Sequence, residues 1–246
     1  MSHKDHGLGR IAAPDAEDAR YPMRATLRTR AIRPPKKSWA FRGSPFDQGS
    51  TGTCVAHACV HFLRCAPIQS TKLKFTPYDL YRELVLIDEW AENDGEAQAP
   101  DSGLQYGSSV RAGVKALEAR GHIAQYVWAQ NLATAVDFVT EHGPIIAGTS
   151  WYDGMFQVTR DGYARIKPND TVAGGHAYLI RAVDTRKARA RIVNSWKTWG
   201  ADSEAWIDFA DLERLIHEDG EICGPTEKKL IKKPKPVAAA DPKSMA

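Results

Sequence analysis

The sequence changes character at Asp47, where a glycine-rich turn leads into an almost uncharged run. The turn is residues 48–53 (QGSTGT), and the run that follows it is residues 54–63 (CVAHACVHFL). A stretch of this length with apolar residues on nearly every face predicts a helix that is buried on most sides. We therefore expect this helix at the centre of the fold.

Helical patterns come first along the chain and strand patterns come second. Capping signals and periodicity predict three further helices, which begin at Thr76, at Ser109 and at about Ala133. Strands are predicted at 145–148, 163–166, 176–183, 190–194 and 205–209. Segregated runs of this kind indicate an α+β fold, in which a helical lobe packs against an antiparallel sheet or barrel lobe and the interface forms the cleft.

Composition divides the chain into an arm, a domain and a tail. Residues 1–38 mix Pro, Arg and small residues without a period, which predicts an extended basic arm that wraps the domain or stays loose. Residues 39–225 form the predicted domain, with a helical lobe at about 47–142 and a sheet lobe at about 143–225. Residues 226–246 are a flexible Lys/Pro/Ala tail.

The net charge of +3 is unevenly distributed. Residues 1–42 carry ten Lys/Arg and four Asp/Glu, and residues 226–246 carry six and two. Subtracting +6 and +4 from the total of +3 leaves −7 for the residues between them. Because the basic segments look like solvated flanks and not like a folded basic face, no nucleic-acid partner is expected.

Targeting signals and the cysteine pattern bear on location. No stretch approaches the ~20 consecutive apolar residues that span a membrane, and the first ten residues have charges where a signal peptide would have an apolar core. Three of the four cysteines, Cys54, Cys59 and Cys65, crowd into one predicted helix, which suits a disulfide framework poorly. We expect a cytoplasmic protein without membrane contact; nothing in the sequence indicates an oligomeric state.

Cys54 lies where a nucleophile would be activated. The N-terminal end of a helix offers free N–H groups and the positive end of the dipole, which stabilise a thiolate. The glycines at 49 and 52 let the backbone approach a substrate carbonyl closely. Taken alone, a cysteine at the start of a buried helix is more often a small core residue.

A thiolate nucleophile needs a base, and the base needs a third group that holds its ring. His176 follows Gly174 and Gly175 at the start of an apolar strand, and Asn194 ends a later strand. The side-chain carbonyl of Asn194 can accept from an imidazole N–H, and Trp196 can cover that bond from water. The ordinary alternatives are a satisfied strand histidine and an Asn-Ser turn.

The order and spacing of these motifs resemble the papain-like (C1 family) cysteine peptidases. The matching elements, between about residues 39 and 209, are an Ala-rich helix, a Gly-His-Ala strand, Gln48-Gly49-Ser50-x-Gly52-x-Cys54 and Asn194-Ser195-Trp196. The resemblance implies the papain-like two-lobed fold and an endopeptidase that hydrolyses bonds in peptide or protein substrates without a cofactor. It implies Cys54 as nucleophile, His176 as general acid and base, and two further roles. By the same match, Asn194 of this chain would orient the histidine, and Gln48 would donate a hydrogen bond to the oxyanion.

Departures from the family pattern are informative. Thr51 stands where secreted members have a disulfide cysteine, and Val55 stands where they have a tryptophan. The Cys-x-Gly-Gly element is absent, and Asp101-Ser102-Gly103 is expected to replace it as the wall along which a substrate lies. The candidate substrate-binding residues are Gly52, Asp101, Ser102, Gly103, Gly175 and Trp196. The short arm in place of a large pro-domain resembles bacterial and phage members, and this basic arm is expected to contact the cleft.

Two other interpretations stay open. Cys54, His57, Cys59, His61 and Cys65 are soft ligands in one predicted helix, where the two histidines lie one turn apart. One helix rarely supplies four tetrahedral ligands, so no metal site is expected. The other interpretation is a member of the same scaffold that is an acyltransferase or a binding or assembly component, because a fold does not fix a reaction.

Overall fold

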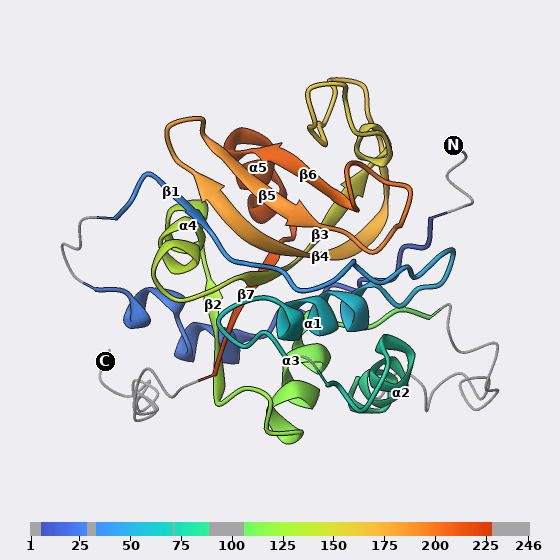
Figure 1. Cartoon of the computed structure of the whole chain (residues 1–246), viewed down its shortest axis with the longest axis vertical. Helices are drawn as coiled ribbons and strands as arrows, with labels where there is room; N and C mark the ends of the chain where they lie inside the picture. The colour runs from blue at the N-terminus through green and yellow to red at the C-terminus, as the bar shows by residue number, and fades with distance from the viewer. Residues whose placement is uncertain (1–5, 29–32, 71, 89–105, 228–246) are drawn as a thin grey trace, which may run out of the picture.

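In the computed structural model, which describes residues 6–28, 33–70, 72–88 and 106–227, a helical half faces a sheet half (Figure 1). The helices are α1 (Cys54–Arg64), α2 (Pro77–Ile87), α3 (Val110–Ala119), α4 (Leu132–Glu141) and α5 (Phe209–Glu218). The strands are β1 (Lys36–Ser38), β2 (Gln125–Ala129), β3 (Ile145–Tyr152), β4 (Val172–Asp184), β5 (Arg189–Val193), β6 (Glu204–Asp208) and β7 (Glu221–Thr226). The predicted α+β class is confirmed.

Helix α1 lies at the centre, between the sheet and the other helices of its half (Figure 1). Every residue from Cys54 to Leu63 is buried. It packs on β4 on one side and on α2 and α3 on the other, so all of its faces are covered by protein. This confirms the prediction from its uncharged sequence.

The helix starts follow from local capping. Thr76 and Asp79 form a reciprocal capping box at the start of α2, with Pro77 in the first turn. At the start of α3, the hydroxyl of Ser109 accepts from the N–H of Ala112. Helix α4 begins one residue earlier than predicted, after the cap Asn131.

The sheet is antiparallel and has the strand order β2-β7-β3-β4-β5-β6, with β1 also paired to β4. In the pairing of β4 with β5, Leu179 lies opposite Val193. This register brings His176, near the start of β4, to the same end of the sheet as Asn194, which follows β5. The site therefore depends on the pairing of β4 with β5, which brings together side chains that are 18 residues apart.

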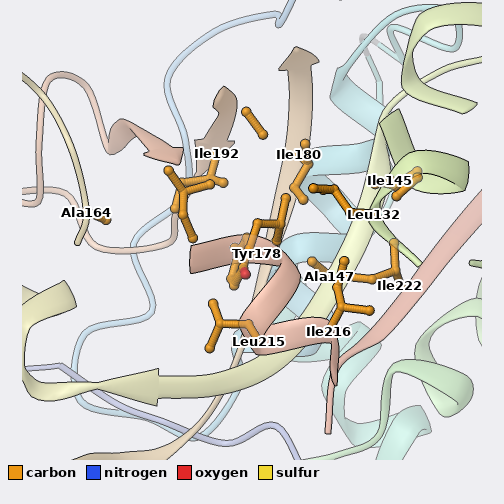
Figure 2. Packing of buried hydrophobic residues seen from close by; sticks show 14 of the residues in the cluster. Leu132, Ile145, Ala147, Ala164, Tyr178, Ile180, Ile192, Leu215, Ile216 and Ile222 are labelled. Carbon is orange, nitrogen blue, oxygen red and sulfur yellow. The ribbon is translucent and has the colours of Figure 1, made fainter. Parts of the chain in front are cut away.

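Two hydrophobic clusters meet at the sheet. On β4, Tyr178 and Ile180 belong to the cluster shown in Figure 2, which also includes side chains of α4 and α5. The alternate residues Ala177 and Leu179 belong to the cluster around α1, α2 and α3. Successive strand residues point to opposite faces, so β4 contributes side chains to both clusters. The sheet is therefore covered by helices on both sides, and β4 packs against α1.

The predicted strand at 163–166 is wrong. This segment forms only an isolated bridge between Tyr163 and Trp206, and the residues around it are turns and loop. Its backbone bonds to β6 involve Trp206, which donates to Gly162 and accepts from Ala164, and the pairing does not extend into a strand. The strands β1, β2 and β7 and the helix α5 were not predicted, and β2 joins the sheet although it lies in the range expected for the helical lobe.

The described part of the N-terminal arm lies against the domain and crosses it from one side to the other (Figure 1). His6 and Arg10 are buried, and Met23 is fully buried in the sheet-side cluster. The expectation of a solvated flank is therefore wrong for these residues, because Arg10 finds acidic partners and Met23 finds an apolar site. Among the helices that the structure describes, none has the length and apolar character needed to cross a membrane.

Candidate active site

The turn before α1 is tied to the loop after β5. Gly49 has a φ of +58°, a left-handed conformation that glycine adopts without strain. The backbone N–H of Gln48 donates to the carbonyl of Ser195 at 2.8 Å. The hydroxyl of Thr51 donates to the carbonyl of Gln48 at 2.7 Å, which closes the turn. These bonds hold the turn against the segment that carries Asn194.

The side chain of Gln48 is fixed by contacts at both ends of its amide. Its Oε1 accepts from the hydroxyl of Ser195, and its Nε2 donates to the carbonyl of Thr51 at 2.6 Å. The same Nε2 donates to the carbonyl oxygen of Gly7 in the arm at 3.1 Å. An amide N–H at the mouth of the turn thus contacts a peptide carbonyl.

Cys54 is the first residue of α1 and is fully buried. Burial raises the pKa of its thiol to about 11, because desolvation disfavours the thiolate. Backbone hydrogen bonding to Ala177 and Gly9, and at the start of the helix to Val55, opposes this rise in pKa. The thiol therefore lies against Ala177 of β4, the residue that follows His176, and the backbone of Gly9 in the arm lies on it.

His176 and Asn194 are joined by a hydrogen bond of 2.7 Å between Nε2 and Oδ1. Because the amide oxygen can only accept, Nε2 carries the proton and Nδ1 is the basic nitrogen. Nδ1 is buried and has no hydrogen-bond partner among the residues that the structure describes. Burial lowers the pKa of His176 to about 3, and the bond to Asn194 opposes this shift.

Two tryptophans enclose the imidazole. The ring of Trp196 stacks on His176 with centroids 4.3 Å apart and planes 18° apart. The ring of Trp151 meets it edge-on, with centroids 4.8 Å apart. His6 of the arm stacks on Trp196 with centroids 4.6 Å apart. The aromatic rings exclude water from the His176–Asn194 bond, which is the role expected for Trp196.

The arm crosses this group of side chains as a main-chain ladder. The N–H of Gly7 donates to the carbonyl of Gly49 at 2.9 Å, and the N–H groups of Gly9 and Arg10 both donate to the carbonyl of Gly175 at 3.0 Å. A Cβ on Gly7 would lie 1.9 Å from the carbonyl oxygen of Thr51. The slot between the turn and β4 therefore admits only main chain at this point.

A second wall of the slot lies before α3. The N–H of Ser108 donates to the carbonyl of Gly9 at 2.7 Å, and the N–H of Ile11 donates to the carbonyl of Ser108 at 3.0 Å. Sequence reasoning did not single out Ser108. No local pattern marks it, because its contact is through the backbone and joins two segments about a hundred residues apart.

Most of the predicted site residues come together. Gln48 bonds to Ser195, the neighbour of Asn194; His176 bonds to Asn194; and Cys54 contacts Ala177, the neighbour of His176. Among the candidate binding residues, Gly52, Gly175 and Trp196 line the path of the arm. Asp101, Ser102 and Gly103 lie outside the described residues. The additional residues that sequence reasoning missed are Trp151, Ser108 and the arm residues Gly7, Gly9 and Arg10.

The histidines of α1 have other partners. Nδ1 of His57 lies 2.9 Å from the carbonyl of Thr53, and Nε2 of His61 accepts from the N–H of Phe46 at 2.8 Å. Within the described ranges, no three His, Cys, Asp or Glu side chains are grouped so that they could hold a metal ion. All four cysteines are buried free thiols.

Solved structures similar to this one are cysteine proteases and their proforms. Xylellain, a cysteine protease from Xylella fastidiosa, matches with a TM-score of 0.66 and 19% identity over 93% of this chain and 100% of that chain. The chain has the papain-like fold. Digestive procathepsin L2 from Tenebrio molitor matches with a TM-score of 0.65 and 17% identity over 92% of this chain and 81% of that chain. ProCathepsin B S9 from Trypanosoma congolense matches with a TM-score of 0.58 and 12% identity over 89% of this chain and 82% of that chain.

The papain-like fold is thus supported by structure and not by sequence similarity, since no protein-family model and no curated protein matches the sequence. The fold expected from the motif order is confirmed. At identities below 20% these likenesses establish the fold, and the chemistry has to be argued from the side chains.

Proposed function

We propose that this protein is a cysteine peptidase, in which Cys54 is the nucleophile and His176 the general acid and base. The observation that carries the proposal is the 2.7 Å bond from His176 Nε2 to Asn194 Oδ1, which leaves the basic Nδ1 without a hydrogen-bond partner among the described residues. The thiol of Cys54, at a helix N-terminus, contacts Ala177, the residue that follows His176 on β4. The contact of Gln48 Nε2 with a peptide carbonyl adds the donor that an oxyanion needs. The likeness to cysteine proteases supports the same reaction.

Hydrolysis follows from these positions in two steps. The Cys54 sulfur attacks the substrate carbonyl carbon with its proton held on His176 Nδ1, and the oxyanion is stabilised by Gln48 Nε2 and the N–H of Cys54. His176 then gives the proton to the leaving amine, and a thioester remains. Water, deprotonated by His176, attacks the thioester and releases the acid and the free thiol.

The arm sets the resting state of this pair. A thiol pKa of about 11 and an imidazole pKa of about 3 make both groups neutral near pH 7. Burial is the largest cause of both shifts and outweighs the bond to Gly9 of the arm, which lowers the pKa of Cys54. We therefore expect that release of the arm and hydration of the site lower the pKa of Cys54, raise that of His176 and favour the thiolate–imidazolium pair.

Peptide or protein substrates fit the geometry of the slot, because its walls bind main-chain groups of the arm. A groove of about 670 Å³, lined in part by Phe156 and Trp199, continues from His6 and extends the path for a substrate chain. An acyltransferase or a pure binding function is not favoured, because the similar solved structures named above are cysteine proteases or their proforms.

The setting of the enzyme is part of the proposal. We place it in a reducing compartment because all four cysteines are buried free thiols. A bacterial or phage origin is supported by the likeness to the Xylella fastidiosa protease over the full length of that chain.

Hydrolysis by Cys54→Ala compared with the wild type tests the reaction. Loss of the nucleophile is expected to reduce hydrolysis of a casein or fluorogenic peptide substrate by at least about 10⁴-fold. The matched control is Cys59→Ala, one turn further along α1, which removes a buried thiol and keeps the nucleophile. Both variants are also made with Arg10→Ala, so that a closed arm cannot hide activity. Equal hydrolysis by Cys54→Ala and its parent would refute the proposal.

A further inference from the structure

The residue that precedes the candidate nucleophile uses its side chain in an unexpected way. Thr53 is the N-cap of α1 and is fully buried, but its hydroxyl makes no capping bond to the helix. The hydroxyl oxygen lies 2.8 Å from the hydroxyl of Thr51 and 3.2 Å from Nδ1 of His57. This side chain therefore connects the turn before α1 with the first turn of the helix.

The donors along this chain of bonds follow from the group at its end. The hydroxyl of Thr51 donates to the carbonyl of Gln48 at 2.7 Å, and a hydroxyl has one proton to donate. The proton between the two threonines therefore comes from Thr53, whose hydroxyl oxygen can only accept from His57. The carbonyl of Thr53, which lies 2.9 Å from Nδ1 of His57, also only accepts. Nδ1 of His57 therefore carries the ring proton.

His57 is a neutral imidazole inside the protein. Burial lowers its pKa to about 4, so the ring has a single N–H near pH 7. With that proton on Nδ1, Nε2 is a bare acceptor, and it is buried without a hydrogen-bond partner among the residues that the structure describes. Such an atom costs stability. An apolar side chain of similar size would avoid this cost, which points to a use of the Nδ1 bond beyond packing.

The Nδ1 bond acts on the peptide that supplies one oxyanion donor. The carbonyl of Thr53 and the N–H of Cys54 belong to one planar unit and point in opposite directions. The carbonyl accepts from Nδ1 of His57 at 2.9 Å and from the backbone N–H of His57 at 3.1 Å. Holding this oxygen from two sides fixes the direction of the Cys54 N–H, and it polarises the amide so that the N–H becomes a stronger donor.

The other end of the chain of bonds holds the second oxyanion donor. Nε2 of Gln48 donates to the carbonyl of Thr51 at 2.6 Å, and the hydroxyl of Thr51 donates back to the carbonyl of Gln48. The position of Thr51 therefore sets the direction of the Gln48 amide. Because Thr53 donates to Thr51, one series of bonds from His57 reaches both donors.

We propose that His57 and Thr53 are positioning residues, which hold the N–H of Cys54 and the amide of Gln48 in the directions that stabilise the oxyanion. The inference rests on the proposed peptidase function, since only the reaction creates an oxyanion. Both residues act through the two donors and not on the substrate. The alternative is that the series of bonds serves only to stabilise the turn.

The ring proton of His57 can be located without a substrate. NMR of protein with isotope-labelled histidine distinguishes a protonated ring nitrogen from a bare one, and comparison with His57→Asn identifies the signals of this residue. We expect a proton on Nδ1 and a bare Nε2 at pH 7. A proton on Nε2, or a charged ring, would overturn the inference whether or not the protein is a peptidase.

Steady-state kinetics separate positioning from stability, with Arg10→Ala as the parent so that the arm does not limit access. His57→Leu is expected to lower kcat about 10- to 100-fold and to change KM less than about twofold, because a misdirected donor is lost only in the transition state. His57→Asn should recover most of kcat, since its amide N–H can replace the Nδ1 proton. The matched control is His61→Gln, which replaces the other histidine of α1 and keeps an acceptor for the N–H of Phe46.

Thr53→Val tests the second link and keeps the shape of the side chain. Loss of its hydroxyl is expected to lower kcat roughly fivefold, whereas Thr53→Ser should keep the activity of the parent. Equal losses of kcat in His57→Leu and His57→Asn would make the imidazole a structural residue. Unchanged kcat in His57→Leu and Thr53→Val would overturn the inference and leave the peptidase in place, whereas absence of hydrolysis by the Arg10→Ala parent would reject the proposed function itself.

Discussion

Cys54 and His176 belong to halves of the molecule that hold them by different means. His176 is held by side chains of the sheet half: it bonds to Asn194 at 2.7 Å and lies between the rings of Trp196 and Trp151. Cys54 is held by the backbone at the start of α1, and the backbone of Gly9 in the arm lies on its thiol. The base is thus positioned whether or not the arm is bound, whereas the state of the nucleophile depends on the arm.

This difference indicates where control of the reaction resides. Moving the arm alters the hydration of the thiol and leaves the Asn194–His176 bond in place. Variants on the helical side should therefore change both chemistry and arm binding. Variants of Asn194, on the sheet side, should change the basicity of the imidazole and leave the bonds of the arm in place.

Among variants that keep both Cys54 and His176, the largest effect is expected from Gln48→Ala, on the helical side. Loss of one oxyanion donor is expected to lower kcat about 10²–10³-fold with a smaller change in KM. The same change removes the 3.1 Å bond to Gly7, so labelling of Cys54 by iodoacetamide should become faster. Gln130→Ala, at an exposed position, is the control. Unchanged kcat would show that the donor role is not filled by this residue.

A smaller effect is expected from Asn194→Ala, on the sheet side. The hydrogen bond to Asn194 raises the pKa of His176, so its loss lowers that pKa and disfavours the imidazolium. We expect kcat/KM to fall roughly tenfold to a hundredfold and its basic limb to move to lower pH. Steady-state kinetics across pH check this, with the exposed Asn169→Ala as control. A basic limb that does not move would contradict the positioning role.

The smallest effect, on the arm itself, is expected from Arg10→Ala. The variant removes the four hydrogen bonds of the guanidinium, so the arm should leave more often and the pKa of Cys54 should fall. Alkylation of Cys54 at pH 7 is expected to become at least about tenfold faster, as followed by peptide mapping. Arg20→Ala removes an arm arginine whose side chain is 54% exposed, and it should leave the rate unchanged. Equal rates in all three proteins would show that the arm does not control the thiol.

The parts of the site that lie in one stretch of sequence were predictable. Gln48 and Cys54 are joined by a short turn whose glycines and following apolar helix are local signals. The capping box of Thr76 and Asp79 likewise needs only four residues. His176 and Asn194 were found because each stands out at a strand end, but their contact depends on the β4–β5 register.

The parts that depend on distant partners were not predictable. Strand β7 contains Gly224-Pro225, a pair that is typical of a turn because proline is unfavourable inside a strand. The strand nevertheless pairs with β2 and β3. Helix α5 is an exception, because Leu212, Leu215 and Ile216 lie on one face and form a local helical pattern that the prediction overlooked. Nothing in the basic arm marks Arg10 as buried, because its acidic partners lie more than two hundred residues away.

The two glycines of the arm limit what an inhibitor of this site could look like. A Cβ on Gly9 would lie 2.0 Å from the carbonyl oxygen of Gly52, as one on Gly7 would clash with Thr51. A compound that follows the arm through the slot must therefore be unsubstituted at both positions and carry its bulk at the ends, over Trp196, where His6 stacks, and beside Glu221, which accepts from the Arg10 guanidinium. Selectivity in such a ligand would come from the spacing of two anchors along a thin backbone.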